Sequence, residues 1–141
     1  MTEITELTGE YLEAVAELDR KVFPYSPWGK ESFAENIRNG YDHPLIALTD
    51  GVLSGYGILR VLSDGEILLL GVDPSFRRKG IGEAILSEMM ALSGEAEKIL
   101  LEVREGNTAA RRLYEKKGFR EIARRKDYYR DPVEDAVIMM G

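Results

Sequence analysis

The sequence predicts an α/β fold in which about four helices flank a mixed β-sheet of about six to seven strands. Three observations predict this class. Segments with apolar residues at helical spacing alternate with short apolar runs that are bounded by turn residues. The last two predicted strands follow each other directly, which favours an antiparallel pair. No repeat or linker rich in Pro, Gly and Ser interrupts the 141 residues, so we expect one domain over residues 1–141.

The first part of the chain is predicted to contain a strand and two helices. Residues 2–7 have the pattern of a short strand, and apolar residues at helical spacing predict a helix over residues 10–22. Pro24 and Pro27 break the chain after this helix. A second helix is therefore expected over about residues 30–38.

A hairpin and a central strand are expected next. The runs 45–48 and 52–62 flank the Asp-Gly pair at residues 50–51, and this pair between apolar runs is a strong hairpin signal. A second turn at residues 63–65 leads into residues 67–70, whose continuous apolar run predicts a buried central strand.

The second half is predicted to alternate helix and strand. The helix after Pro74 has an apolar face made of Ile81, Ile85, Met89 and Leu92. Residues 99–103 form the next strand, and the helix that follows ends at Gly118, a typical C-terminal cap after two cations. Strands at 119–125 and 136–140 complete the sheet.

Composition excludes several kinds of site. The chain has no cysteine, so it has no disulfide framework or cysteine nucleophile. It has a single histidine, His43, so we expect no metal site, and we expect His43 to be structural or solvent-exposed rather than catalytic. The net charge of −6 disfavours nucleic acid as a partner. With no signal-peptide pattern and no apolar run near the ~20 residues that span a bilayer, we expect a cytoplasmic protein without a membrane partner.

The stretch VDPSFRRKGIG at residues 72–82 is the first functional signal. It leaves the predicted central strand and enters a helix, whose N-terminus offers unpaired N–H groups and a partial positive charge to an anion. Gly80 and Gly82 let a ligand approach the backbone. The stretch has neither the Walker pattern nor that of a dinucleotide loop. Taken alone it predicts an anion-binding turn, with solvated cations and incidental glycines as the alternative.

This stretch resembles the pyrophosphate-binding motif of the GNAT superfamily of N-acetyltransferases, in which a strand ending in Val-Asp-Pro precedes Arg/Gln-x-x-Gly-x-Gly/Ala. The resemblance implies a GNAT fold and acetyl-coenzyme A (acetyl-CoA) as the acetyl donor. It assigns to the pantetheine arm the residues Leu70, Gly71 and Val72. It assigns to the pyrophosphate the residues Arg77, Arg78, Lys79, Gly80, Ile81, Gly82 and Glu83.

A second signature lies at residues 101–119, LEVREGNTAARRLYEKKGF. It resembles the Glu-Val-Arg-x-x-Asn-x-x-Ala…Leu-Tyr-x-x-x-Gly-Phe block of the same superfamily, and more narrowly the ribosomal-protein alanine N-acetyltransferases of the RimI-like branch. The resemblance covers essentially the whole chain. It implies that the acceptor is the N-terminal α-amine of a protein, such as a ribosomal protein, and we expect a monomer or weak homodimer.

Glu102 and Tyr114 are the predicted catalytic pair. An α-amine has a pKa near 7.7–8.0, so a base must remove a proton before the amine attacks a thioester. Glu102 alternates with the apolar Leu101 and Val103, and we expect partial burial to raise its pKa. The resemblance assigns Glu102 as the base, acting directly or through water, and Tyr114 as the acid that protonates the departing thiolate.

Each of these roles has a structural alternative. Glu102 would otherwise pair with Arg104 or Lys98 at the sheet edge. Tyr114 would otherwise be a core residue with a hydrogen-bonded hydroxyl. Asn107 is expected to cap the following helix and, by resemblance, also to contact the coenzyme.

The acceptor side is less sharply defined by the sequence. By resemblance, the acceptor is expected to contact aromatic residues of loops that flank the peptide entrance, namely Tyr25, Trp28, Tyr128 and Tyr129. The same side chains are equally consistent with surface-loop anchors. Leu69 stands where the bacterial alanine enzymes carry Asn, so the acceptor preference stays open. Transfer to a lysine side chain or a small amine is one alternative function. A non-catalytic acyl-CoA-binding module is another, which the presence of both Glu102 and Tyr114 disfavours.

Overall fold

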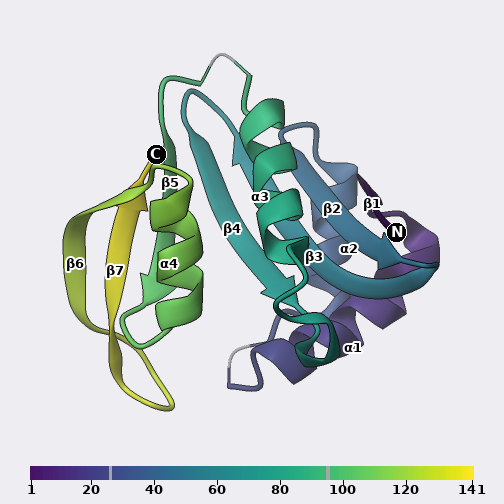
Figure 1. The fold of residues 1–141 in the computed structure, drawn as a ribbon, viewed down its shortest axis with the longest axis horizontal. Helices are drawn as coiled ribbons and strands as arrows, with labels where there is room; N and C mark the ends of the chain where they lie inside the picture. The colour runs from purple at the N-terminus through teal and green to yellow at the C-terminus, as the bar shows by residue number, and fades with distance from the viewer. Residues whose placement is uncertain (26, 95) are drawn as a thin grey trace.

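The computed structural model describes residues 1–25, 27–94 and 96–141. A seven-stranded sheet runs through the molecule in the order β1-β2-β3-β4-β5-β7-β6 (Figure 1). Its strands are β1 (Thr2–Glu6), β2 (Asp42–Thr49), β3 (Val52–Val61), β4 (Gly65–Val72), β5 (Ile99–Arg104), β6 (Arg120–Tyr129) and β7 (Glu134–Met140). β4 and β5 pair in parallel, whereas the other neighbours pair antiparallel. The predicted mixed sheet is thereby confirmed.

Two layers of helices cover the sheet. The helices are α1 (Leu12–Val22), α2 (Lys30–Arg38), α3 (Ile81–Leu92) and α4 (Thr108–Lys116). Figure 1 shows α3 and α4 in front of the sheet and α1 and α2 on the opposite face. Each layer has its own core, because apolar residues alternate between the two faces of a strand. The α3/α4 core includes Ile85, Leu101 and Tyr114, and the α1/α2 core includes Phe33 and Tyr56.

The predicted elements are confirmed, with shifts at their ends. The hairpin at Asp50-Gly51 has φ of +50° and +82°, the left-handed pair that a two-residue turn requires. The helix expected from residue 10 begins as a 3-10 turn, Gly9–Tyr11. β2 starts at Asp42, earlier than expected, because its first residues pair with the end of β3. None of the helices in the described part of the chain is both long and apolar enough to cross a bilayer.

The strand β6 forms one edge of the sheet and is longer than predicted. It continues past residue 125 to Tyr129, so Tyr128 and Tyr129 end a strand, whereas we expected them in a loop. The pairing with β7 shifts register between Arg125 and Tyr129, and Asp127 there has a φ of +50°. All residues of β6 before Tyr129 are exposed to solvent.

The strands β4 and β5 separate part-way along their length. They pair only from Gly65–Ile67 against Ile99–Leu101, although β4 continues to Val72 and β5 to Arg104. The separation is visible in Figure 1, where the two ribbons diverge toward their C-terminal ends. β4 also carries a register shift opposite Ile58 and Leu59. Backbone groups at the end of β4 are therefore available to a ligand that lies between the strands.

Candidate active site

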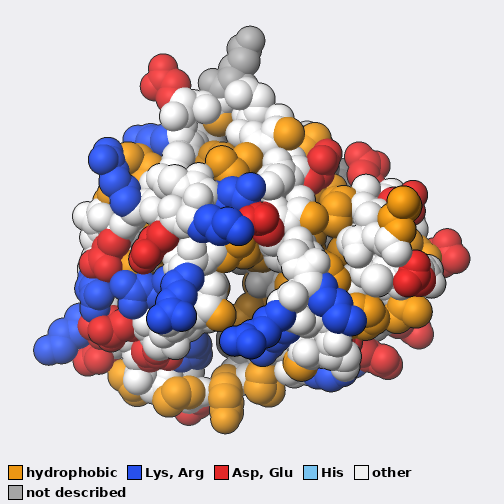
Figure 2. All heavy atoms as spheres, in the orientation of Figure 1, with side chains coloured by type: hydrophobic (Ala, Val, Ile, Leu, Met, Phe, Trp, Pro, Cys, Tyr) orange, Lys and Arg blue, Asp and Glu red, His pale blue; other side chains and the backbone are white. Residues whose placement is uncertain are grey.

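A cavity of about 580 Å³ lies where β4 and β5 separate, between the start of α3 and the helix α4. Figure 2 shows a hollow on this face, with Lys and Arg side chains at its rim. Most residues that we predicted to bind the donor line it: Leu70, Gly71, Val72, Arg77, Arg78, Gly80, Ile81, Gly82, Glu83 and Asn107. Tyr114 lines it as well. The structure thus brings together two motifs that are separated in the sequence.

The turn before α3 has the backbone of an anion site. Arg78 and Gly80 have φ of +64° and +77°, and Gly80 is the residue that precedes the first turn of α3. Left-handed residues of this kind curl the chain into a concavity of N–H groups. Helix bonding begins with the N–H of Ala84, which donates to the carbonyl of Gly80 at 3.0 Å. The N–H groups of the preceding first turn are free to bind an anion.

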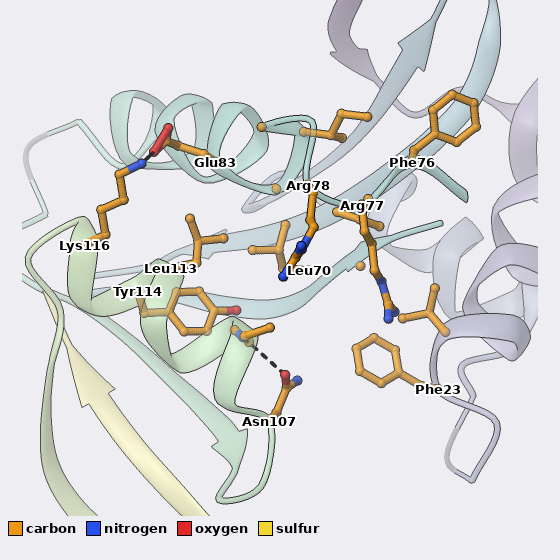
Figure 3. Close-up of a pocket in the computed structure, with 18 residues that line it drawn as sticks. Phe23, Leu70, Phe76, Arg77, Arg78, Glu83, Asn107, Leu113, Tyr114 and Lys116 are labelled. Carbon is orange, nitrogen blue, oxygen red and sulfur yellow. Dashed lines mark hydrogen bonds and ion pairs between the residues drawn. The ribbon is translucent and has the colours of Figure 1, made fainter. Parts of the chain in front are cut away.

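The cations of this turn do not all face the cavity. Figure 3 shows the side chains of Arg77 and Arg78 extending into it. Lys79 does not line the cavity, and its ammonium lies over the ring of Phe76, 5.4 Å from the centroid. At the opposite end, Lys116 of α4 pairs with Glu83 at 2.6 Å, and this hydrogen bond lowers the pKa of Glu83 (Figure 3). Lys116 is a lining cation that the sequence did not single out.

Asn107 and Tyr114 approach the cavity from the α4 side. The side chain of Asn107 accepts a hydrogen bond from the N–H of Ala110 at 3.2 Å, so the predicted helix cap is confirmed. Tyr114 is only 6% exposed and packs against Phe119 at a centroid distance of 5.7 Å. Burial raises the pKa of Tyr114 above its usual range, which keeps the phenol protonated. Its hydroxyl points into the cavity (Figure 3).

Glu102 lies on the other face of β5. Leu101 and Val103 pack into the α3/α4 core, so the alternating side chain of Glu102 faces the α1/α2 side. Its side chain is 34% exposed, and the guanidinium of Arg125 lies 4.0 Å from its carboxylate. The structural alternative expected Glu102 to pair with Arg104 or Lys98. Among the described residues, Arg104 instead pairs with Glu134, and Lys98 pairs with Asp64.

Two tyrosines from the end of β6 surround Glu102. Hydrogen bonding to Glu102 raises the pKa of Tyr128. Burial, reinforced by the negative charge of Glu102, raises the pKa of Tyr129 to about 12. The two rings meet edge to face at 5.1 Å. The predicted base and two of the predicted acceptor residues therefore form one group.

A second cavity, of about 370 Å³, adjoins the first. The two share Val22, Phe23 and Asn107 as lining residues. Tyr25 lines the second cavity, whereas the predicted base Glu102 and the predicted acceptor residues Trp28, Tyr128 and Tyr129 line neither. We call residues 23–29, between α1 and α2, the acceptor loop, after the acceptor contact that was predicted for its residues Tyr25 and Trp28; its residue 26 lies outside the described part of the chain.

Arg104 organises the far wall of the second cavity, and the sequence did not single it out for this role. Its guanidinium donates to the carbonyls of Pro132 at 3.0 Å and Arg130 at 3.2 Å, and pairs with Glu134 at 3.2 Å. It also lies over the ring of Tyr129, 4.4 Å from the centroid. One cation thus connects the end of β5 to the segment between β6 and β7.

Comparison with known proteins agrees with this geometry. The Acetyltransferase (GNAT) family matches residues 12–119, most of the chain. The chain belongs to this family. As a GNAT enzyme it is an N-acetyltransferase that takes its acetyl group from acetyl-CoA, as the two motifs predict. The GNAT fold is confirmed with it.

Individual GNAT relatives resemble nearly the full chain. A Bacillus subtilis (strain 168) protein is 39% identical over 134 residues, 92% of this chain and 88% of its own length. The ribosomal protein bS18-alanine N-acetyltransferase of Escherichia coli K12 is 34% identical over 148 residues, 99% of this chain and 96% of its own. The crystal structure of the E. coli ribosomal-protein-S18-alanine enzyme superposes with a TM-score of 0.89 at 30% identity, covering 99% of this chain and 92% of that one. The chain is therefore RimI-like, as its second signature predicts.

Proposed function

We propose that this GNAT enzyme transfers acetyl to the N-terminal α-amine of a protein, with a ribosomal protein as the first acceptor to test. The observation that carries the proposal is the near full-length similarity to N-terminal acetyltransferases such as the E. coli bS18-alanine enzyme. The adjoining second cavity supports it, because it offers an extended chain a place beside the donor cavity. A cytoplasmic location follows, since ribosomal proteins are made and assembled there.

Acetyl-CoA is proposed to occupy the larger cavity. The free N–H groups of α3 and the guanidinium groups of Arg77 and Arg78 would hold the pyrophosphate. The separated end of β4, at Leu70 to Val72, would pair with the amides of the pantetheine arm. The N–H of Val72 would also stabilise the negative charge that develops on the thioester oxygen.

Glu102 and Tyr114 are proposed to act from opposite faces of β5. On the α1/α2 side, Glu102 takes a proton from the ammonium or amine of the acceptor, directly or through water. The amine nitrogen then bonds to the thioester carbon. When the carbon–sulfur bond breaks, its electron pair goes to the sulfur of CoA, which leaves on the side of Tyr114. Because burial raises the pKa of Tyr114, its protonated hydroxyl is available to the sulfur that leaves. A buried tyrosinate is unfavourable, so Tyr114 acts first as a hydrogen-bond donor and regains any proton it gives.

The acceptor class is tested with a panel of amines. Short peptides beginning with Ala, Ser or Met are compared with polyamines and with peptides that carry an internal lysine and a blocked N-terminus. We expect kcat/KM to be highest for the peptides with a free N-terminus, at least ~10²-fold above the other amines. Only these peptides carry an α-amine, whose pKa near 7.7–8.0 makes it easy to deprotonate, at the end of an extended chain. Turnover of polyamines or internal lysines alone would replace the peptide proposal by the small-amine or lysine alternative.

The catalytic base is tested by Glu102→Gln. We expect turnover to fall by ~10²–10⁴-fold while acetyl-CoA binding stays near normal. Glu105→Gln is the matched control, because Glu105 is an exposed glutamate three residues along that pairs with Arg124. Unchanged turnover in Glu102→Gln would remove Glu102 as the base.

A further inference from the structure

Asp19 of α1 is a buried carboxylate that the mechanism above does not use. It is 0% exposed and occupies the apolar face of α1, one turn after Val15. A buried carboxylate is unfavourable unless hydrogen bonds satisfy it. The hydroxyl of Tyr56 donates to its Oδ1 at 2.5 Å, and the backbone N–H of Trp28 donates to its Oδ2 at 2.5 Å. Burial raises the pKa of Asp19, and these two hydrogen bonds oppose the rise.

Asp19 accepts a hydrogen bond at both ends of the acceptor loop. Its backbone carbonyl accepts from the N–H of Phe23 at 2.8 Å, where the loop leaves α1. Its carboxylate accepts from the N–H of Trp28, shortly before α2 begins. Between these points lies Tyr25, which lines the second cavity, and Phe23 lines both cavities. The bond from Phe23 is the last backbone bond of α1, so the side chain of Asp19 holds the acceptor loop at one point, the N–H of Trp28.

The same carboxylate reaches the donor side through Tyr56. Tyr56 lies on β3 opposite Gly71 of β4, and a Cβ on Gly71 would lie only 2.6 Å from the Tyr56 ring. The ring therefore rests directly on the backbone of β4, one residue before Val72. It also contacts Phe33 edge-on at 6.1 Å, and Phe33 contacts the ring of Trp28 at 5.7 Å.

We propose that Asp19 is a positioning residue for acetyl transfer, whose carboxylate fixes the acceptor loop relative to the end of β4. The proposal rests on the proposed function, because it treats the acceptor loop as a wall of the acceptor site. Transfer requires the amine and the thioester carbon to meet at about 3–3.5 Å in a defined orientation. Asp19 sets this spacing, since it binds the loop on one oxygen and, through Tyr56, the donor strand on the other.

Two variants test the two halves of this connection. Asp19→Asn removes one acceptor oxygen and leaves a side-chain NH2 group against a donor. Tyr56→Phe removes only the hydroxyl and keeps the ring on Gly71. We expect each to raise the KM for the acceptor peptide about tenfold and to leave the Kd of acetyl-CoA within about twofold, because the turn before α3 is untouched. In the double variant, we expect the fold-increase in acceptor KM to be smaller than the product of the increases in the two single variants.

Trp28 gives a readout that does not depend on the acceptor. It is the single tryptophan of the chain, so its fluorescence reports on the acceptor loop alone. We expect both variants to shift Trp28 emission to longer wavelength and to increase its quenching by acrylamide. If wild type acetylates no peptide, the proposed function fails, but the emission of Trp28 and the KM of whichever amine is accepted still test the positioning role.

Asp42→Asn is the matched control for the loss of a buried carboxylate. Asp42 is 7% exposed and accepts from the Nε of Arg60 at 2.7 Å, at the start of β2. We expect a lower Tm in this variant without a change in acceptor KM or Trp28 emission. An equal rise of acceptor KM in Asp42→Asn would assign the effect to general stability and overturn the proposal. Unchanged KM and emission in Tyr56→Phe, which retains the packing even if Asp19→Asn fails to fold, would also overturn it.

Discussion

The proposed donor side and the proposed acceptor side of the active site are built in different ways. The donor side is mostly backbone: a left-handed turn, the first turn of α3 and the separated end of β4. The acceptor side is held by side chains that join distant segments, with Asp19 attaching the acceptor loop and Arg104 attaching the segment between β6 and β7. A site built from backbone depends on the few positions where a side chain would fill it, whereas a site held by long-range side chains depends on each of those side-chain contacts.

The largest effect is expected from Gly82→Asp on the donor side. The new carboxylate would stand in the first turn of α3, where the pyrophosphate is proposed to bind, and the two anions repel. We expect the affinity for acetyl-CoA, measured by calorimetry, to fall by more than about 100-fold. Gly82→Ala is the control, because its Cβ, 3.3 Å from Leu113, adds bulk without charge. An equal loss in Gly82→Ala would mean that space, not charge, limits this position.

Tyr114→Phe should have the next largest effect and should separate chemistry from binding. Removing the hydroxyl deprives the leaving sulfur of its hydrogen-bond donor, so we expect kcat to fall by ~10²-fold with little change in either KM. Since burial raises the pKa of Tyr114, the wild-type rate should show no loss from its deprotonation even at about pH 10, where an unshifted tyrosine would be half deprotonated. Steady-state kinetics over this range, with both substrates varied, measure both expectations. A fall in the rate at neutral pH that disappears in Tyr114→Phe would contradict the protonated state.

A smaller effect on the donor side is expected from Arg78→Gln. We expect the KM for acetyl-CoA to rise about tenfold, and the difference from wild type to shrink at high salt as phosphate contacts are screened. Lys79→Gln is the matched control, because Lys79 lies over Phe76 and does not line the cavity. Equal effects of the two substitutions would show that general charge, and not a direct contact, attracts the donor.

The smallest effect is expected on the acceptor side from Glu134→Gln. This change weakens the pair with Arg104 and the bond from the N–H of Gly106. We expect a roughly threefold rise in acceptor KM, which corresponds to the free energy of a partly exposed ion pair, and an unchanged Kd for acetyl-CoA. If the acceptor KM and the Kd of acetyl-CoA both rise, the substitution has also disturbed the donor side through the turn that leads to Asn107, and the two sides are not independent.

The residues that line the larger cavity were easier to predict from the sequence than the surroundings of the acceptor loop and of the end of β6, for a physical reason. The donor turn is local, so glycine positions and the strand-to-helix switch reveal it within a dozen residues. Lys79 was predicted together with its neighbours to bind the pyrophosphate. The neighbours line the cavity, but the ammonium of Lys79 lies over the ring of Phe76. Lys116 was missed because its approach to Glu83 depends on how α3 and α4 pack.

The acceptor side depends on contacts that periodicity does not encode. Tyr128 and Tyr129 were expected in a loop, but a register shift lets β6 continue through them. Asp19 did leave a signal in the sequence, because an acidic residue on the apolar stripe of α1, between Val15 and Val22, must find partners inside. Which partners it finds, Tyr56 and Trp28, only the tertiary structure decides.

The exposed edge strand β6 has a consequence for the behaviour of the protein in solution. An unpaired strand edge is a template for joining other chains. Here the edge is protected by its charges at Arg120, Glu121, Arg124, Arg125, Lys126 and Asp127, and by the register shift that bends it near Asp127. We expect variants that neutralise these charges to keep the fold but to be less soluble. Engineering of this strand is therefore expected to cause aggregation before it causes unfolding.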